Sequence, residues 1–198
     1  MLHLFEEKVL PYRAEQHEAW TAGDKSLVPP WHPVHDIVRN QPTYHFAEFL
    51  TLDHYHRTEG WRGFRFFVLG VPSDMGNERY APGGEMIDRL ISPDKLTAFR
   101  RARSTDPREF KFAKGEPDLF LYKDGGDAMF LEVKKGKDAP DAEQYQLRCL
   151  SQIRSILGIR AEIVYVVEEG KLYNPRRHEY DLPEVSAAAR APFVRRRG

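Results

Sequence analysis

Two carboxylates and an ammonium group occur in one short stretch of the sequence, at a spacing that could bring them together. Asp118 opens an apolar run, and Glu132 and Lys134 come late in the next one, with Gly125-Gly126 between the two runs. A Gly-Gly pair in this position predicts a β-hairpin. The hairpin would place Asp118 close to Glu132 and Lys134 at one end of a sheet. Two such carboxylates repel each other unless a cation joins them, and oxygen ligands with room for water suit Mg²⁺.

The second run divides into two faces, because side chains of a strand alternate. Met129, Leu131 and Val133 share one face and are all apolar, so this face is expected to pack on a core. Glu132 shares the other face with Phe130 and the lysine. A charged pair inside an otherwise apolar strand indicates a site rather than a solvated ion pair.

A helix upstream supplies a further acid. We predict this helix over residues 43–59, with Thr43 as its N-cap and Gly60 as its end. Glu48 lies at the edge of its apolar face, which consists of Phe46, Phe49, Leu50 and Leu52. The segment 62–70 then predicts a strand.

The stretch described above resembles the PD-(D/E)xK nuclease superfamily, and within it the VRR-NUC (virus-type replication-repair nuclease) family. The matching residues are Gly115, Pro117, Asp118, Glu132, Val133, Lys134, Gly136 and Asp138, followed by a Gln at the head of a helix. The resemblance continues through Gly158 and the apolar run 163–167, and it covers somewhat less than half of the chain. One departure is Lys137, where family members usually carry Pro.

The resemblance implies a metal-dependent DNA endonuclease that hydrolyses phosphodiester bonds with Mg²⁺, for which Mn²⁺ can substitute. Asp118, Glu132 and the backbone carbonyl of Val133 would be metal ligands. Glu48 would be a third acid that reaches the metal through a water molecule. Lys134 would orient or deprotonate the attacking water, although base action requires a pKa lowered from about 10.4.

The family also carries a Gln that orients the water or the Lys, and two residues compete for this role here. Gln144 keeps the spacing from Asp138 that the family shows. Gln146 keeps the helical phase, with Cys149 and Leu150 behind it. We favour Gln146, because the phase of a helix decides which side chain faces the sheet.

The resemblance implies an α/β fold with a restriction-endonuclease-like core, in which helices flank a mixed sheet. Residues 1–42 are expected to be an N-terminal helical extension and linker, with the helix over 1–22. Residues 43–170 would be the nuclease domain, with an insertion over 71–114. Residues 171–198 would be a polar, Arg-rich C-terminal tail.

The insertion is expected to be helical over residues 86–103, with Pro93 dividing it into two pieces. Its basic end lies just before the first strand of the hairpin. We therefore predict DNA contacts there, from Arg100, Arg101, Arg103 and Lys114.

Composition narrows the class of protein. Lys+Arg and Asp+Glu both number 30 among 198 residues, so the net charge of zero argues against a strong non-specific nucleic-acid binder. Cys149 is the single cysteine and excludes an internal disulfide. No apolar run approaches membrane-spanning length, and the first residues do not resemble a signal peptide. These features predict a cytoplasmic protein with no membrane partner.

Several biological roles stay open at this level. Family members act in repair or in mobile elements, often on branched or structured DNA. An antibacterial toxin, delivered into the cytoplasm of a target cell and held by an immunity protein, is one alternative. A module that binds nucleic acid or protein without cutting is another. A homodimer that cuts both strands is also compatible with the resemblance.

Overall fold

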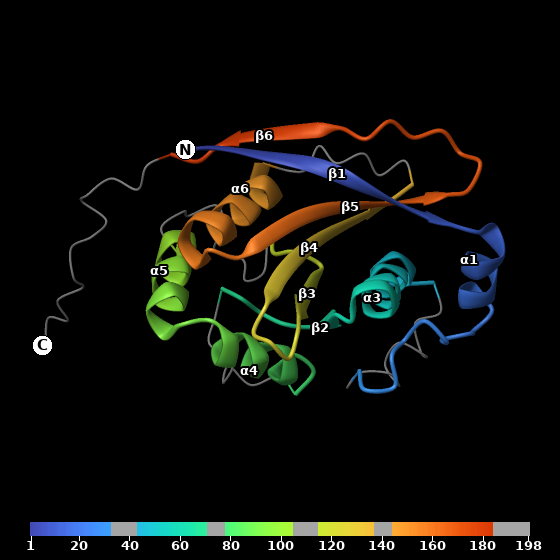
Figure 1. The fold of residues 1–198 in the computed structure, drawn as a ribbon, viewed down its shortest axis with the longest axis horizontal. Coiled ribbons are helices and arrows are strands. Elements are labelled where there is room, and N and C mark those ends of the chain that lie inside the picture. The colour runs from blue at the N-terminus through green and yellow to red at the C-terminus, as the bar shows by residue number, and fades with distance from the viewer. Residues whose placement is uncertain (33–42, 71–77, 105–114, 137–143, 184–198) are drawn as a thin grey trace, which may run out of the picture.

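The computed structural model describes residues 1–32, 43–70, 78–104, 115–136 and 144–183. Within these residues the chain forms a mixed six-stranded sheet flanked by helices, which confirms the predicted α/β class (Figure 1). The strands are β1 (Leu2–Tyr12), β2 (Arg62–Phe64), β3 (Leu119–Tyr122), β4 (Ala128–Lys135), β5 (Arg160–Glu168) and β6 (Arg177–Asp181). The helices are α1 (Ala14–Thr21), α3 (Phe46–Glu59), α4 (Ala81–Leu90), α5 (Pro93–Ser104) and α6 (Gln144–Gln152), which continues into the π-helical turn η2 (Ile153–Leu157).

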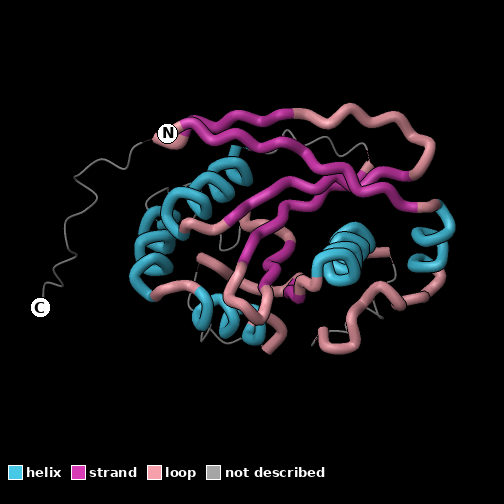
Figure 2. Tube along the Cα trace, viewed as in Figure 1, coloured by secondary structure: helices cyan, strands magenta, loops and turns pink. Residues whose placement is uncertain are grey.

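The strands follow the order β2-β3-β4-β5-β1-β6 across the sheet. The first three are antiparallel neighbours, β5 runs parallel to both β4 and β1, and β6 is antiparallel to β1. The parallel connection from β4 to β5 passes through α6, as a parallel pair requires. Figure 2 shows the resulting strands as one continuous curved layer.

A separate apolar core lies on each face of the sheet. One face is covered by α4, α5 and α6, and its core includes Ile87, Phe99, Phe130 and Leu150. The other face is covered by α1 and α3, and its core includes Trp20, Phe49, Leu52, Leu131 and Val164. The predicted core face of β4 is therefore confirmed, and its opposite face is buried as well.

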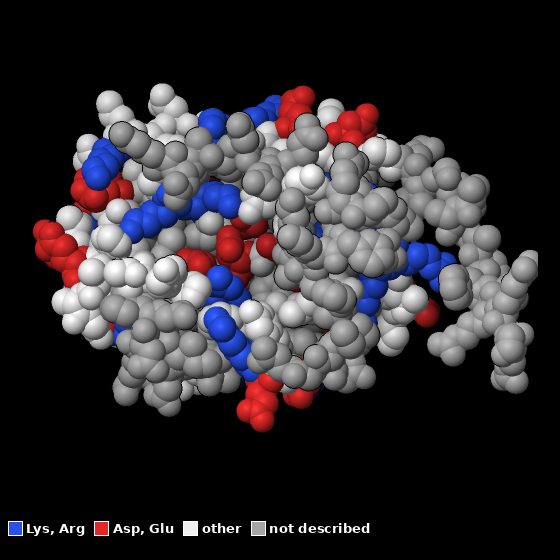
Figure 3. Space-filling view, turned by 180° about the vertical axis from the view of Figure 1, so that it is seen from behind, with Lys and Arg blue, Asp and Glu red and all other residues white. Residues whose placement is uncertain are grey.

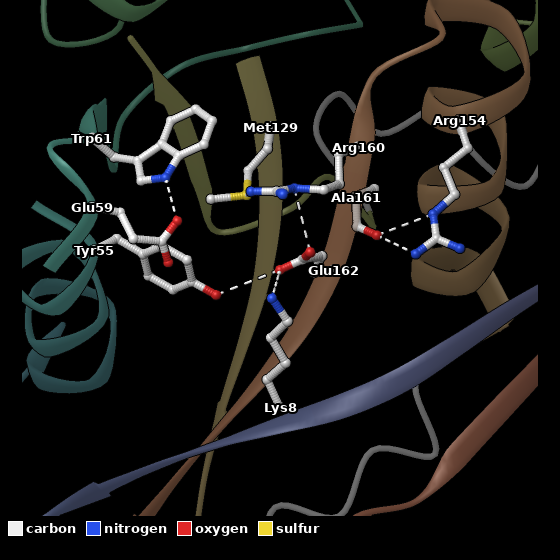
Figure 4. A network of polar contacts seen from close by, with 9 residues as sticks. All are labelled: Lys8, Tyr55, Glu59, Trp61, Met129, Arg154, Arg160, Ala161 and Glu162. Atoms are coloured by element: carbon white, nitrogen blue, oxygen red, sulfur yellow. Dashed lines mark hydrogen bonds and ion pairs between the residues drawn. The ribbon is translucent and has the colours of Figure 1, made fainter. Parts of the chain in front are cut away.

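A polar network fixes α3 against the sheet (Figure 4). The hydroxyl of Tyr55 donates to Glu162 Oε2 on β5, at 3.4 Å. The same carboxylate pairs with Lys8 of β1 at 2.8 Å and with Arg160 at 3.3 Å. Two strands and a helix thereby meet at one side chain, which links α3 to the sheet.

The predicted N-terminal helix over residues 1–22 is wrong for its first half. Residues 2–12 form β1, and only Ala14–Thr21 are helical. Buried and exposed side chains alternate along most of β1, with Phe5 and Glu7 facing inward. The strand pairs with both β5 and β6, so tertiary pairing overrides a helix-like spacing of apolar residues.

The helix predicted over 43–59 is confirmed as α3, and Gly60 ends it with a φ of 74°. Its N-cap is His45 rather than Thr43, and no side chain caps the helix by a hydrogen bond. His45 has a φ of 64°, a left-handed conformation that costs a non-glycine residue roughly 1–3 kcal/mol.

The strand predicted over 62–70 stops at Phe64. The backbone N–H groups of Leu69 and Gly70 donate instead to the carboxylate of Glu116, at 2.9 and 2.8 Å. A side chain has thus taken the place of a neighbouring strand as their acceptor.

The remaining predicted elements are close to those observed. The hairpin turns at Gly126 with a φ of 90°, and Gly158 ends the helix after it with a φ of 70°. The helical insertion breaks before Pro93 as predicted, although α4 starts earlier, at Ala81.

Residues 177–181 were predicted as part of a tail, but they form β6 at the edge of the sheet. Within the described residues, no helix is long and apolar enough to cross a membrane.

Candidate metal and nuclease site

The hairpin places Asp118 opposite Glu132. Leu119 of β3 is paired with Leu131 of β4, and the strands are antiparallel, so the residue before Leu119 lies opposite the residue after Leu131. The backbone N–H of Val133 donates to Asp118 Oδ2 at 2.9 Å, which fixes the aspartate at the end of β3. The sequence prediction that these two carboxylates meet is therefore realised in the structure.

The two oxygens of Glu132 have different surroundings. The side chain is almost fully buried, with 1% exposed. Its Oε1 accepts a hydrogen bond from Lys134 Nζ at 2.5 Å and a second from Gln146 Nε2. Its Oε2 is buried and has no hydrogen-bond partner among the described residues. The carboxylate is therefore held firmly on one side and left unsatisfied on the other.

Of the two competing glutamines, Gln146 has a described side chain, and it contacts Glu132. Gln146 lies in the first turns of α6 and reaches the site, in agreement with the helical phase. Gln144 is the first residue of the same helix, and its side chain lies outside the described part of the chain.

Electrostatics show that the carboxylates of Asp118 and Glu132 oppose each other. Burial raises the pKa of Glu132 well above its usual range, and the negative charge of Asp118 raises it further, against the nearby charge of Lys134. Burial also raises the pKa of Asp118, and the charge of Glu48 adds to this effect. Removal of water is the larger cause of both pKa shifts, and a neighbouring negative charge is the second cause, that of Asp118 for Glu132 and that of Glu48 for Asp118.

Glu48 approaches the same region from the start of α3. Its Oε1 accepts from His45 Nδ1 and from Arg65 Nε, each at 3.1 Å. Burial alone would raise the pKa of Glu48, but the hydrogen bond from His45 and the charge of Arg65 outweigh it and lower the pKa. Glu48 is therefore an ionised carboxylate whose Oε1 is already engaged, and its predicted water-mediated role stays a prediction.

Glu116 fixes the start of β3. It holds the backbone of Leu69 and Gly70, as described above, and its neighbour Gly115 has a φ of 76°. A Cβ on Gly115 would lie 2.8 Å from the carbonyl oxygen of Tyr145, so the chain passes close to α6 here. The two residues before Pro117-Asp118 therefore contact both the end of the segment that follows β2 and helix α6.

The donor set fits a divalent metal at this place. The unsatisfied, buried Oε2 of Glu132 beside the carboxylate of Asp118 is an arrangement that a cation would stabilise. Among the described residues, no three His, Cys, Asp or Glu side chains converge in a way that could hold a metal. Two carboxylates with remaining positions for water match Mg²⁺, which keeps several water ligands. The carbonyl of Val133 stays a predicted further ligand.

The predicted DNA contacts on α5 fit less well. Arg103 is 7% exposed and lies over Phe99, and its charge lowers the pKa of Glu116 against the raising effect of burial. This burial contradicts a role for Arg103 as a surface phosphate contact. Arg100 donates to the carbonyl of Leu69 and pairs with Asp88 at 3.2 Å, so it links α5 to α4 and to the segment after β2. Arg101 is exposed and remains a candidate, and Lys114 lies outside the described residues.

Sequence reasoning missed Arg65 and Glu116. Arg65 is a single charge between Phe64 and Phe66, and such an isolated charge in an aromatic run was the available signal. Glu116 stands directly before the Pro117-Asp118 pair, but its acceptor role depends on Leu69 and Gly70, which lie far away in the sequence.

Charged side chains gather on the face opposite to the view of Figure 1. Figure 3 shows acidic atoms near the middle of this face, with Lys and Arg atoms close to them. The zero net charge of the whole chain therefore hides a locally uneven distribution.

The sequence matches no protein-family model and no curated protein.

Proposed function

We propose that the protein is a Mg²⁺-dependent nuclease that hydrolyses phosphodiester bonds of DNA. The observation that carries the proposal is the buried carboxylate pair of Asp118 and Glu132. One oxygen of this pair lacks a hydrogen-bond donor, and both pKa values are raised. Such a pair destabilises the fold unless it serves a bound cation, and strongly perturbed groups concentrate at functional sites.

Mg²⁺ held by the two carboxylates would supply the positive charge that draws a phosphate to an acidic site and makes water a better nucleophile. The protein's own groups have distinct tasks. Gln146 and Lys134 both bind Oε1 of Glu132, which leaves its Oε2 available for a metal. The ammonium group of Lys134 is the nearest cation to this pair, so it is suited to orient water and to offset charge in the transition state.

The order of the elements supports the same proposal. The resemblance predicts a helix, a strand, a two-stranded hairpin, a helix and a strand. The chain contains α3, β2, β3-β4, α6 and β5 in this order, with α4 and α5 inserted between β2 and β3. The acid of the first helix and the glutamine of the later helix both come toward the hairpin.

DNA cleavage tests the proposal. The protein is incubated with supercoiled, linear, single-stranded and branched DNA in Mg²⁺, Mn²⁺ or EDTA, and products are separated on gels. We expect cleavage in either metal and none in EDTA. Asp118→Asn and Lys134→Ala should each reduce the rate by at least about a hundredfold, since both remove a group that acts in the transition state.

Asp127→Asn is the matched control for the first variant, because Asp127 is an exposed aspartate of the same hairpin. It should cut at the wild-type rate. Wild-type rates in both Asp118→Asn and Lys134→Ala would refute the site. A wild type that binds DNA but leaves every substrate intact would favour the non-cutting module.

A further inference from the structure

A second cluster of charges lies next to the candidate metal site, around the ring of Phe66. The guanidinium carbon of Arg65 lies 5.1 Å from the centre of this ring, and that of Arg79 lies 3.9 Å from it. Phe66 is itself 3% exposed, so the ring is a fixed support. The face of an aromatic ring attracts a guanidinium group and limits its orientation.

Arg65 connects this cluster to the acidic site. Its Nε donates to Glu48 Oε1 at 3.1 Å, and its charge lowers the pKa of Asp118 against the larger raising effect of burial. Its Nη groups make no hydrogen bond within the described residues. His45, which binds the same oxygen of Glu48, lies edge-on to Phe66, with ring centres 5.7 Å apart.

Arg79 reaches the cluster from the segment before α4. It is half-buried, and its guanidinium also lies 5.6 Å from the ring centre of Tyr80. Tyr80 packs edge-on against Phe66 at 5.9 Å. The guanidinium groups of Arg65 and Arg79 thus both lie beside one ring.

A DNA strand that approaches Asp118, Glu132 and Glu48 meets three carboxylates, so its phosphates need a local source of positive charge. Arginine is well suited to this task, because its planar set of N–H donors matches the oxygens of a phosphate. Glu48 holds Arg65 through Nε, which leaves the Nη edge for such a ligand.

We propose that Arg65 and Arg79 together bind a backbone phosphate of DNA beside the candidate metal site. This inference rests on the proposed function and gives the site its means of holding the substrate. It also assigns Glu48 a structural task, which is to keep Arg65 in place whether or not it contacts a metal.

The salt dependence of DNA binding tests this inference separately from cleavage. A fluorescein-labelled duplex is titrated with protein in EDTA, at several salt concentrations, and fluorescence anisotropy gives the affinity. Arg65→Gln and Arg79→Gln should each bind several-fold more weakly. Each should also lower the slope of log affinity against log salt by about one, as expected for one lost phosphate contact.

Arg57→Gln is the matched control, since Arg57 also donates through Nε to a carboxylate, that of Asp53, but on an exposed part of α3. Its slope should equal that of the wild type. Arg65→Lys should restore the slope, because it keeps the charge. Thermal melting followed by circular dichroism checks folding. If Arg65→Gln does not fold, Arg79→Gln decides the question, because Arg79 is not bonded to Glu48.

Wild-type slopes in both glutamine variants, or a wild type without salt-dependent binding, would overturn the phosphate subsite. Metal-dependent cleavage together with such unchanged slopes would leave the nuclease function standing and refute only the subsite. Reduced slopes in a protein that never cuts would support the subsite and refute the nuclease function.

Discussion

Glu132 is a buried carboxylate that is hydrogen-bonded at only one of its two oxygens. Its Oε1 is bound by Lys134 and Gln146, whereas its Oε2 is buried without a donor in the described part of the chain. An unsatisfied buried acceptor costs about 1–3 kcal/mol, and more if it is charged. A bound cation would offset this cost.

Asp118→Asn should stabilise the metal-free protein, because it removes one of two opposed charges and leaves an oxygen to accept from Val133. We expect a gain of roughly 1 kcal/mol, which corresponds to a rise in melting temperature of about 2–4 °C. Differential scanning calorimetry in EDTA measures this change. Asp127→Asn should leave the melting temperature unaltered, and a lower melting temperature for Asp118→Asn would contradict the proposed repulsion.

The central residues were predictable from the sequence, and their supporting residues were not. A hairpin with alternating faces is enough to bring Asp118 to Glu132, and the helical phase favours Gln146, which contacts Glu132. Arg65 could not be identified in this way, because its hydrogen bond to Glu48 depends on where α3 places that side chain. The burial of Arg103 likewise depends on packing between elements, which a run of basic residues does not reveal.

At the scale of elements, one buried acid of β1 adds side-chain bonds to the backbone pairing that joins β6 to the sheet. Glu7 accepts from the hydroxyl of Tyr173, from Arg176 N at 2.8 Å and from His178 Nε2 at 2.8 Å. The guanidinium group of Arg176 adds an ion pair at 3.4 Å. Burial raises the pKa of Glu7, but these bonds and the charge of Arg176 outweigh it, so the net shift is downward.

This lowered pKa predicts acid sensitivity of the edge of the sheet. The unfolded chain binds a proton near the ordinary value of 4.5, before the folded chain does. The stability that Glu7 contributes is therefore present above that pH and is lost as the pH falls through the lower folded pKa. Urea unfolding between about pH 7 and pH 3 should show a weaker pH dependence in Glu7→Gln than in the wild type.

Glu6→Gln is the matched control for this measurement, because Glu6 is the exposed neighbour of Glu7 on β1. It should keep the steep pH dependence of the wild type. Parallel curves for Glu7→Gln and the wild type would show that Glu7 does not carry the effect.

The elements themselves were predicted well where the contacts are local. The hairpin, the helix of Glu48 and the break at Pro93 follow from turn residues and helix periodicity. The N-terminal segment was mispredicted, because Leu4, Phe5, Val9 and Leu10 also fit a helical stripe. Its strand depends on pairing with β5, whose residues lie about 150 positions later in the sequence.

At the scale of the whole molecule, a neutral chain concentrates its charge at a few places. Acidic and basic atoms lie close together on one face (Figure 3). The proposed site likewise combines a carboxylate pair with nearby arginines. Such an arrangement favours a ligand that carries both a cation and phosphates over non-specific binding to polyanions. A chain with a net charge of zero could in this way bind the proposed DNA substrate.

The carboxylate pair as a metal site is the central claim, and Mn²⁺ binding without DNA tests it most directly. Isothermal titration calorimetry at about pH 7.5 should detect one Mn²⁺ site in the wild type, weakened at least about tenfold in Asp118→Asn. Lys134→Ala should bind Mn²⁺ at least as tightly as the wild type, because it removes a competing charge from Glu132. Equal Mn²⁺ affinity in Asp118→Asn and the wild type would contradict the account.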